Sequence, residues 1–230
     1  MAKKKRPPRK AVCVPLSPAV IHSIGGLESL PPPDSEFDPD GTWTHVYRIW
    51  TCYGYDVGRT DGTLRLERTP DRLKVRQAMR NADNVLNTIE ADVRCDGDRP
   101  VSWVLESTFT DTKGTPAPRL TQQSTVRQAA HGATSDWCLF STVQRLPFEA
   151  REPLRFDVYE GLSLLKKGHR LWYHGAETVK LGSGSHRLHV FHQIGRGTLP
   201  YEYWVDEGHR LQVVVTGPRA YILDPKGGAK

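Results

Sequence analysis

The sequence of 230 residues lacks the signatures by which many enzymes and nucleotide-binding proteins are recognised. It contains no Gly-x-Ser-x-Gly elbow, no Walker loop and no dinucleotide-binding glycine fingerprint. Its glycine-rich pieces, Gly182-Ser-Gly-Ser185 and Gly195-Arg-Gly197, lie in expected hairpin loops. A phosphate cradle would need a helix N-terminus after such a loop, and a strand is expected there instead. The sequence therefore assigns no catalytic residue and implies no cofactor.

Cysteines are few and lie far apart, at Cys13, Cys52, Cys95 and Cys138. No Cys-x-x-Cys pair is present, so neither a zinc ribbon nor a thioredoxin-like redox motif is indicated. Two interpretations remain open. The thiols are unpaired core residues, or one disulfide, for which Cys52–Cys95 is the predicted pair, forms in an oxidising compartment.

Long apolar runs are also missing, and without eighteen consecutive apolar residues we expect no transmembrane span. The net charge of +6 arises from residues 1–10, which hold six Lys/Arg and no acid, so the remaining chain is balanced. The basic run and residues 11–21 resemble a degenerate export signal that Pro15, Ser17 and Pro18 interrupt. A featureless tail, a nucleic-acid arm and a membrane tether are the alternatives.

Turn-forming residues are abundant, with 17 prolines and 20 glycines. Proline and acidic residues are dense over 30–41, which predicts a mobile linker. We therefore expect a disordered basic, Pro-rich tail and linker over 1–41, a single folded domain over 42–224 and a frayed tail over 225–230.

Alternating and β-branched segments bounded by turn residues follow one another from Trp43 onward. Strands are expected at 43–55, 63–68, 72–79, 84–94, 101–109, 119–127, 154–159, 169–173, 177–181, 185–193, 201–205, 210–216 and 219–223. Strands spaced by about ten residues imply one large antiparallel sheet or barrel. A sheet of this length must curl or close.

The segment 199–216 is predicted to be a β-hairpin that turns at Asp206-Glu-Gly-His209, where Gly208 is expected to take a positive φ. Tyr201, Tyr203 and Val205 should lie on one face of its first arm. Glu202 and Trp204 should lie on the other face.

One segment has a helical period instead. Trp137, Phe140, Val143 and Leu146 recur at near-helical spacing, Ser135 or Asp136 can cap the start, and Pro147 ends the segment. The sequence therefore predicts a mainly β fold. It is a large curled antiparallel sheet, or half-open β-barrel, with one short amphipathic helix at about 135–146 packed in its concavity.

The order of several motifs resembles a known group of proteins. The motifs are Tyr53-Gly-Tyr-Asp-Val-Gly58, Asp98-Arg-Pro-Val-Ser-Trp103, Trp137-Cys-Leu-Phe-Ser-Thr-Val-Gln-Arg-Leu-Pro147 and Leu199-Pro-Tyr-Glu-Tyr-Trp-Val-Asp-Glu207. Over residues 42–224 they resemble uncharacterised bacterial secreted or envelope proteins of the domain-of-unknown-function kind, whose half-open β-barrel is related to the lipoprotein carriers LolA and LolB. The resemblance implies that fold and a periplasmic or secreted location. It offers no catalytic residue to carry over.

Aromatic side chains form the candidate ligand site. They either line an apolar concavity, as acyl-chain carriers do, or pack as ordinary core beneath the helix. The predicted lining residues are Trp103, Trp137, Phe140, Trp172 and Trp204, with Trp50 as a further member of the aromatic set. A non-enzymatic protein that binds an apolar ligand or a protein partner is the expected function.

Histidines and acids near residues 186–209 offer the alternative of a hydrolase or metal-dependent enzyme. In a strand, His186 and His192 share one face while His189 points to the other, so the three do not converge on a metal ion. Asp206, Glu207 and His209 are expected in an exposed turn. An enzyme would require one of these histidines to meet a carboxylate in a pocket.

Overall fold

The computed structural model describes residues 29–53, 56–80, 85–110, 113–115, 120–125, 132–149, 151–217 and 219–226. For residues 52, 53, 56–60 and 120–125 only the backbone path is described. The predicted basic run and the export-like segment therefore lie outside the described residues.

Within this described part, thirteen strands form a single sheet. They are β1 (Trp43–Tyr53), β2 (Asp56–Thr69), β3 (Arg72–Arg80), β4 (Leu86–Asp96), β5 (Arg99–Thr110), β6 (Leu120–Thr125), β7 (Ala133–Ser135), β8 (Leu154–Glu160), β9 (Leu164–Leu181), β10 (Gly184–Ile194), β11 (Tyr201–Val205), β12 (Leu211–Thr216) and β13 (Arg219–Leu223). The sheet order is β6-β5-β4-β3-β2-β1-β13-β12-β11-β10-β9-β8-β7, and the first and last strands of the chain are therefore neighbours at its centre.

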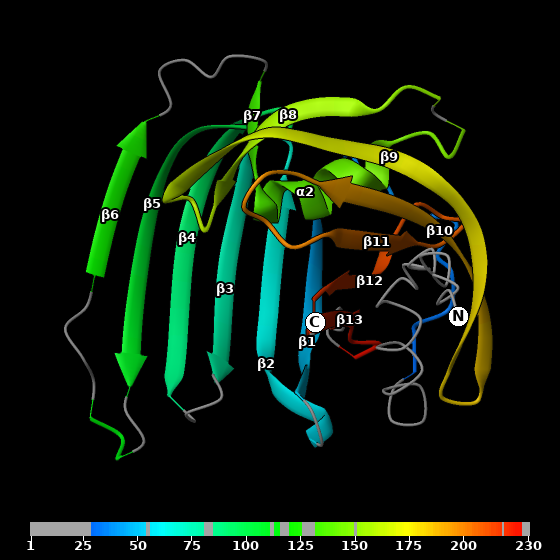
Figure 1. The fold of residues 1–230 in the computed structure, drawn as a ribbon, viewed down its shortest axis with the longest axis horizontal. Helices are drawn as coiled ribbons and strands as arrows, with labels where there is room; N and C mark the ends of the chain where they lie inside the picture. The colour runs from blue at the N-terminus through cyan, green and yellow to red at the C-terminus, as the bar shows by residue number, and fades with distance from the viewer. Residues whose placement is uncertain are drawn as a thin grey trace, which may run out of the picture.

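The sheet curls until its two edges approach each other (Figure 1). Across this seam the hydroxyl of Thr134 in β7 donates to the carbonyl of Asp98, just before β5, at 3.1 Å. The rings of Trp103 in β5 and Tyr159 in β8 lie 5.1 Å apart between centroids. The predicted mainly β fold with one large curled sheet is confirmed, and its strand pairs are antiparallel except for the parallel pair of β7 and β8.

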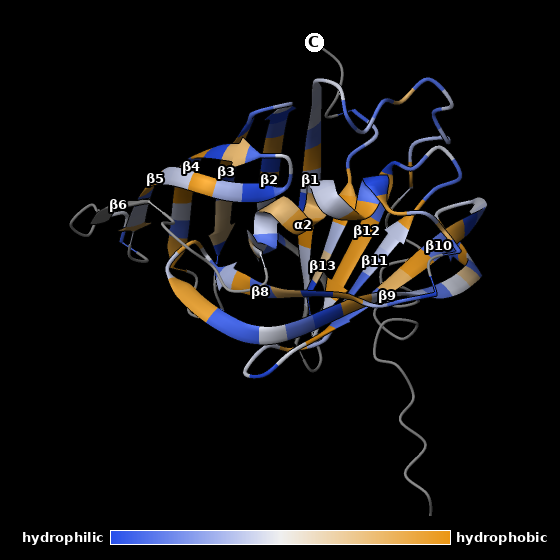
Figure 2. Ribbon diagram, turned by 90° about the horizontal axis from the view of Figure 1, so that it is seen from above, coloured by the Kyte–Doolittle hydropathy of each residue, from blue (hydrophilic) through white to orange (hydrophobic). Residues whose placement is uncertain are grey.

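The helix α2 (Asp136–Thr142) lies inside the curl, between β1–β3 on one side and β8–β9 on the other (Figure 2). The Ser135 hydroxyl caps it by accepting the Cys138 N–H at 3.0 Å. A 3-10 turn, η1 (Val143–Arg145), continues it, and Pro147 follows. The prediction of one short helix in the concavity is confirmed. The helix buries more than the single apolar stripe expected of an amphipathic helix, since six of its seven residues are buried.

The sheet buries side chains on both faces in its central part. Phe191, Tyr203 and Val214 form one row on the concave face, and Val190, Trp204 and Val213 form the next row on the convex face. The convex cluster comprises Leu30, Trp50, Leu181, Leu188, Val190, Trp204, Val213, Val215, Ala220 and Ile222. This second core explains why all six residues of β12 are buried.

Residues 29–41, predicted to be linker, lie against the fold. Leu30 is buried in the convex cluster, and the Arg210 guanidinium donates to the Pro32 carbonyl. Gly208 lies so close to the Asp34 carbonyl that a Cβ there would be 2.3 Å from its oxygen. The packed part of the chain therefore begins before Thr42.

The turn of the 199–216 hairpin differs from the prediction in one detail. His209, with φ 67°, takes the left-handed conformation that was predicted for Gly208. Glycine is needed at position 208 for a different reason: because it has no Cβ, the Asp34 carbonyl can come close to it. The predicted strand faces of the hairpin are correct, because Tyr203 and Val205 join the concave core and Trp204 joins the convex cluster.

His45 makes stability sensitive to acid. Its buried ring stacks on Trp43 at 4.4 Å and bonds the Tyr47 hydroxyl at 3.2 Å through Nδ1. Burial, assisted by the positive charge of Arg210, lowers the pKa of His45 from 6.5 to about 3. Between pH 6.5 and about 3, His45 is therefore protonated in the unfolded chain but neutral in the folded chain. The free energy of unfolding consequently falls as the pH falls from 6.5 towards 3.

We expect the titration of His45 to remove about 2 kcal/mol between pH 7 and pH 5. The variant His45→Phe should lose correspondingly less free energy of unfolding over that pH range, since the phenylalanine ring does not titrate. Tyr47 keeps a second partner in this variant, the Leu211 carbonyl at 3.2 Å. Urea midpoints of both proteins at the two pH values test this. An identical pH dependence in the two proteins would show that His45 is not the source.

Candidate functional site

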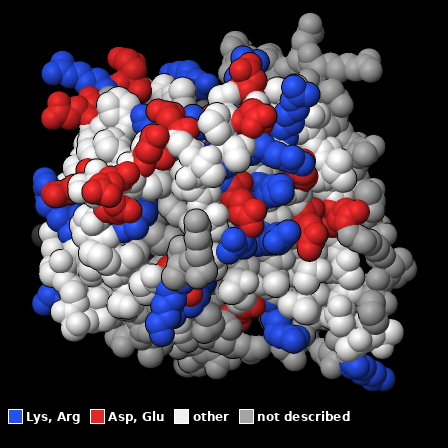
Figure 3. Space-filling model, turned by 180° about the vertical axis from the view of Figure 1, so that it is seen from behind, with Lys and Arg blue, Asp and Glu red and all other residues white. Residues whose placement is uncertain are grey.

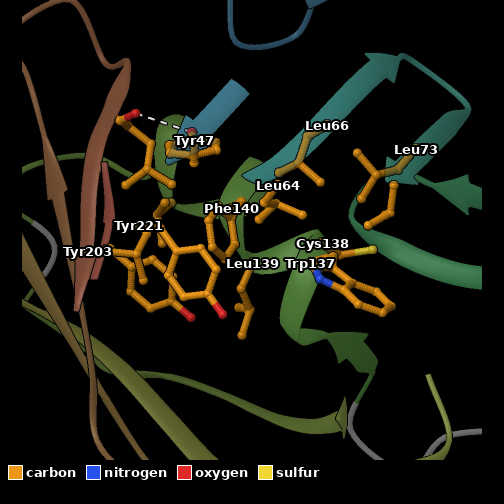
Figure 4. Packing of buried hydrophobic residues seen from close by; sticks show 14 of the residues in the cluster. Tyr47, Leu64, Leu66, Leu73, Trp137, Cys138, Leu139, Phe140, Tyr203 and Tyr221 are labelled. Atoms are coloured by element: carbon orange, nitrogen blue, oxygen red, sulfur yellow. Dashed lines mark hydrogen bonds between the residues drawn. The ribbon is translucent and has the colours of Figure 1, made fainter. Parts of the chain in front are cut away.

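Among the described residues, the concave face of β3–β5 is covered at one end only. Under α2, the inward rows Leu73–Val93–Trp103 and Val75–Ala91–Leu105 are buried. Figure 1 shows α2 across one end of the sheet, and Figure 4 shows Trp137 and Phe140 among the leucines of β2 and β3. The space beneath the helix is thus filled by side chains.

Further along the same strands the inward positions become accessible. Gln77, Ile89 and Ser107 form a half-buried row. The row beyond it ends with Phe109, whose exposed fraction is 39%. We call the six inward residues of these two rows the uncovered strip; they are Gln77, Met79, Asn87, Ile89, Ser107 and Phe109.

The uncovered strip combines apolar and polar groups. Met79, Ile89 and Phe109 supply the apolar surface. Beside them the Ser107 hydroxyl donates to the Asn87 side-chain oxygen at 3.3 Å. An apolar surface with a few polar groups at its border is typical of ligand sites.

Only part of the predicted aromatic lining shares the concave face. Trp103, Trp137 and Phe140 belong to the concave core, with exposed fractions of 3–5%. Trp204 lies in the convex cluster, and Trp172 pairs with His192 on that same outer face. The prediction that all five line one concavity is therefore wrong for Trp172 and Trp204, because both occupy outward positions of their strands.

The uncovered strip was not predicted as a site. Its residues alternate along 77–79, 87–89 and 107–109 like any inward face of a strand. Their accessibility depends on where α2 ends above the sheet, which no local pattern records. An inward Asn, Gln and Ser in strands that otherwise alternate with apolar residues was the signal that could have marked them.

A buried polar layer fixes the helix on the sheet. The Arg68 guanidinium donates to the Gly97 carbonyl at 2.8 Å and to the Ser141 hydroxyl at 3.3 Å. Arg145 donates to the same hydroxyl at 2.7 Å and pairs with Asp98. Burial raises the pKa of Asp98, and the Arg145 charge acts in the opposite direction. These bonds tie the helix to the residues beneath it, so we assign them to structure.

The predicted disulfide partners are far apart. Cys52 is in β1 and Cys95 in β4, so three interstrand spacings, about 14 Å, separate them across the sheet. The strand register also places them towards opposite ends of the sheet. A disulfide requires Cα atoms within about 7 Å. The predicted Cys52–Cys95 pair is therefore wrong, and both Cys95 and Cys138 are buried free thiols.

The histidines of residues 186–209 do not meet at one point. The Phe148 ring is stacked between His189 at 3.6 Å and His209 at 4.2 Å, and the Tyr173 hydroxyl bonds His189 at 2.9 Å. His192 lies on the convex face, 3.7 Å from Glu202, where burial lowers its pKa to about 4. No group of three His, Cys, Asp or Glu among the described residues could hold a metal ion.

Asp206 in the hairpin turn is a structural carboxylate. It is buried, accepts the Arg210 N–H at 2.9 Å and accepts the Gln212 amide at 2.6 Å. Burial raises its pKa, which these hydrogen bonds oppose. Both of its carboxylate oxygens thus accept hydrogen bonds that hold the turn.

The convex face of β3–β5 carries charges of both signs. Its shallow hollow, of about 240 Å³, is lined mainly by Lys74, Arg76, Glu90, Asp92 and Glu106. Figure 3 shows Lys/Arg and Asp/Glu intermixed over this face. With no excess of one sign, this face offers no charge pattern for a polyanion.

The fold and its core define a curled β half-barrel whose concave face holds one helix. No helix among the described residues is long and apolar enough to span a membrane. No protein-family model and no curated protein matches the sequence. Among solved structures, the chain is similar to a β-barrel-like protein of domain of unknown function DUF1849 from Brucella abortus. That match has 7% identity and a TM-score of 0.46, and covers 85% of this chain and 98% of the other.

Proposed function

We propose that this half-barrel is a non-enzymatic binding protein, and that it holds an acyl chain or a similar apolar ligand on the uncovered strip. One observation carries the proposal. The inward rows of β3–β5 are buried under α2 at one end, and at the other end Phe109 is 39% exposed. An apolar ligand would continue the core from the point where the helix ends.

The chemistry of the strip favours an amphipathic molecule. Met79, Ile89 and Phe109 provide contact for an apolar chain, and methionine adapts well to variable apolar partners. The side chains of Asn87, Ser107 and Gln77 provide donors and acceptors for a polar end group. A purely polar solute would leave the apolar part without a partner.

We also propose that the protein works outside the cytoplasm, in the periplasm or as a secreted protein. The export-like pattern of residues 1–21 and the motif resemblance to envelope proteins support this location. The resemblance to acyl-chain carriers supports the same ligand class as the uncovered strip.

The ligand proposal is tested by titration with a fluorescent long-chain fatty acid and by native mass spectrometry of the purified protein. Phe109→Asp should weaken fatty-acid binding at least about tenfold, since it places a charge on the apolar strip. Val104→Asp is the matched control, because Val104 is in the same strand at 36% exposure and faces outward. That control should bind within about twofold of the original protein.

Equal binding by the Phe109→Asp and Val104→Asp variants would contradict the assignment of the strip. A protein that neither carries nor binds any acyl chain would contradict the ligand class. The alternative would then be a protein partner that pairs with β6. This strand ends the sheet order among the described strands and presents a backbone edge.

A further inference from the structure

Exposed apolar side chains gather on one part of the half-barrel. Of the eight large apolar side chains exposed among the described residues, three belong to β5 and five to the region from β8 to β11. Four of these five lie at two connections between strands. They are Leu164 and Leu165 at the start of β9, Ile194 at the end of β10 and Leu199 before β11, with exposed fractions of 55%, 37%, 36% and 58%. Single exposed leucines are ordinary, but such a group indicates an interaction surface.

The β8–β9 connection and the β10–β11 loop are in contact. The Lys166 ammonium donates to the Gly197 carbonyl. Gly195 lies so close to the His169 ring that a Cβ there would be 2.3 Å from its Nδ1. An added Cβ at Gly197 would meet no described atom within 4 Å, so the loop projects outward. Together the two connections form one surface, which we call the turn surface and define as residues 163–170 and 194–200.

The turn surface carries basic residues and no acidic residue. Its cations are Lys166, Lys167, Arg170 and Arg196. Among the described residues only Lys166 has a carboxylate partner, Glu160 at 2.7 Å. Arg170 lies directly opposite Arg155 in the register of β8 and β9, and like charges in opposed positions destabilise a sheet. An anionic partner would offset this repulsion.

The exposed leucines stand on a firmly anchored turn. Leu162, two residues before Leu164, is fully buried in the concave core and takes a φ of 55°. The Gly161 N–H donates to the Asp136 carboxylate of α2 at 2.9 Å. The apolar side chains that follow are therefore held outside by the fold, and a partner would bind them without first ordering the turn.

We propose that the turn surface docks this protein on an anionic phospholipid bilayer. The leucines would enter the boundary between headgroups and acyl chains, and the lysines and arginines would lie at the level of the phosphates. A nucleic acid would use the cations but would leave the leucines without a partner. β8 and β9 lie across α2 from β1–β3 (Figure 2), so this docking keeps the charged convex face of β3–β5 in water. The proposal goes beyond the ligand of the uncovered strip and does not depend on it.

The test is cosedimentation of the full chain with lipid vesicles. Vesicles of about three parts phosphatidylcholine to one part phosphatidylglycerol should bind at least about tenfold more tightly than pure phosphatidylcholine vesicles. Binding should weaken as the salt concentration rises from about 0.1 M to about 0.5 M, because salt screens the ionic attraction. Equal binding to the two vesicle types, or no binding to either, would overturn the proposal.

Two double variants separate the ionic from the apolar contribution. Lys167→Gln with Arg196→Gln should weaken vesicle binding at least about tenfold, since each cation near an anionic surface contributes about fivefold. Leu164→Ser with Leu199→Ser should also weaken vesicle binding at least about tenfold, since both leucines lose their burial in the bilayer. All four side chains are exposed, so the fold should tolerate both pairs of changes.

The matched control is Val101→Ser with Val104→Ser. Both valines are exposed, at 39% and 36%, but they belong to β5 and lie outside the turn surface. The control should bind vesicles within about twofold of the original protein. A leucine variant that binds as well as this control would refute insertion of the turn surface.

A local readout is needed because residues 1–10 carry six further cations that attract the same vesicles. Hydrogen exchange of the amides of residues 195–199 should slow at least about threefold when phosphatidylglycerol vesicles are added. Exchange in the turn at residues 206–210, outside the turn surface, should not change. Unchanged exchange at residues 195–199 on protein that has bound vesicles would assign the binding to another part of the chain and overturn the proposal.

Discussion

Replacing Phe140 with alanine should lower the free energy of unfolding by about 3–5 kcal/mol, as measured by urea denaturation. Phe140 is 3% exposed and is the centre of the concave core. Its ring makes edge contacts with Tyr47, Tyr203 and Tyr221, at centroid distances of 5.4, 6.2 and 5.6 Å. Alanine would leave a cavity bordered by three tyrosine rings from three strands.

The variant Phe140→Leu separates the contribution of buried volume from the contribution of the aromatic edge contacts. Leucine fills much of the volume but makes no aromatic edge contacts, so we expect a loss of about 1–2 kcal/mol. A loss below about 1 kcal/mol for Phe140→Ala would contradict the docking of α2 in the concavity.

Replacing Trp204 with alanine should also cost about 3–5 kcal/mol, on the opposite face of the sheet. Trp204 is 1% exposed and pairs in register with Val190 and Val213, both in the convex cluster. The large effect would establish that the convex face of β10–β13 is a true second core. Urea denaturation measures it.

The matched control is Trp172→Ala. Trp172 lies on the same convex face in β9 but is only partly buried, beside His192 at a centroid distance of 5.7 Å. Its removal should cost about 1–2 kcal/mol. Equal losses for the two tryptophans, or a loss below about 1 kcal/mol for Trp204, would contradict the second core.

Local patterns were sufficient for much of the fold. The period of Trp137, Phe140 and Val143, with Ser135 before it and Pro147 after it, located the helix because caps and helical spacing are local properties. The alternation of Tyr201, Tyr203 and Val205 correctly separated the two faces of the hairpin. Two predicted strands at 169–173 and 177–181 are one strand, β9, which continues through Gly175 at φ 147°.

The candidate site depended on information that is not local. Trp172 and Trp204 were assigned to the concavity on the assumption that only one face is buried, but Leu30 and neighbouring strands bury part of the other face. The uncovered strip follows from the length of α2 relative to the strands below it.

The pairing of β1 with β13 has a consequence for how the molecule reaches this structure. Thr51 lies opposite Arg219, so the central strand pair joins the two ends of the described chain. Loop-closure entropy makes so distant a pairing a slow step. During synthesis, strands β1–β6 and β7–β12 can form two separate arrays of neighbours, but the sheet's centre stays open until β13 has left the ribosome. The joining of these two arrays at the centre of the sheet is therefore a late step of folding.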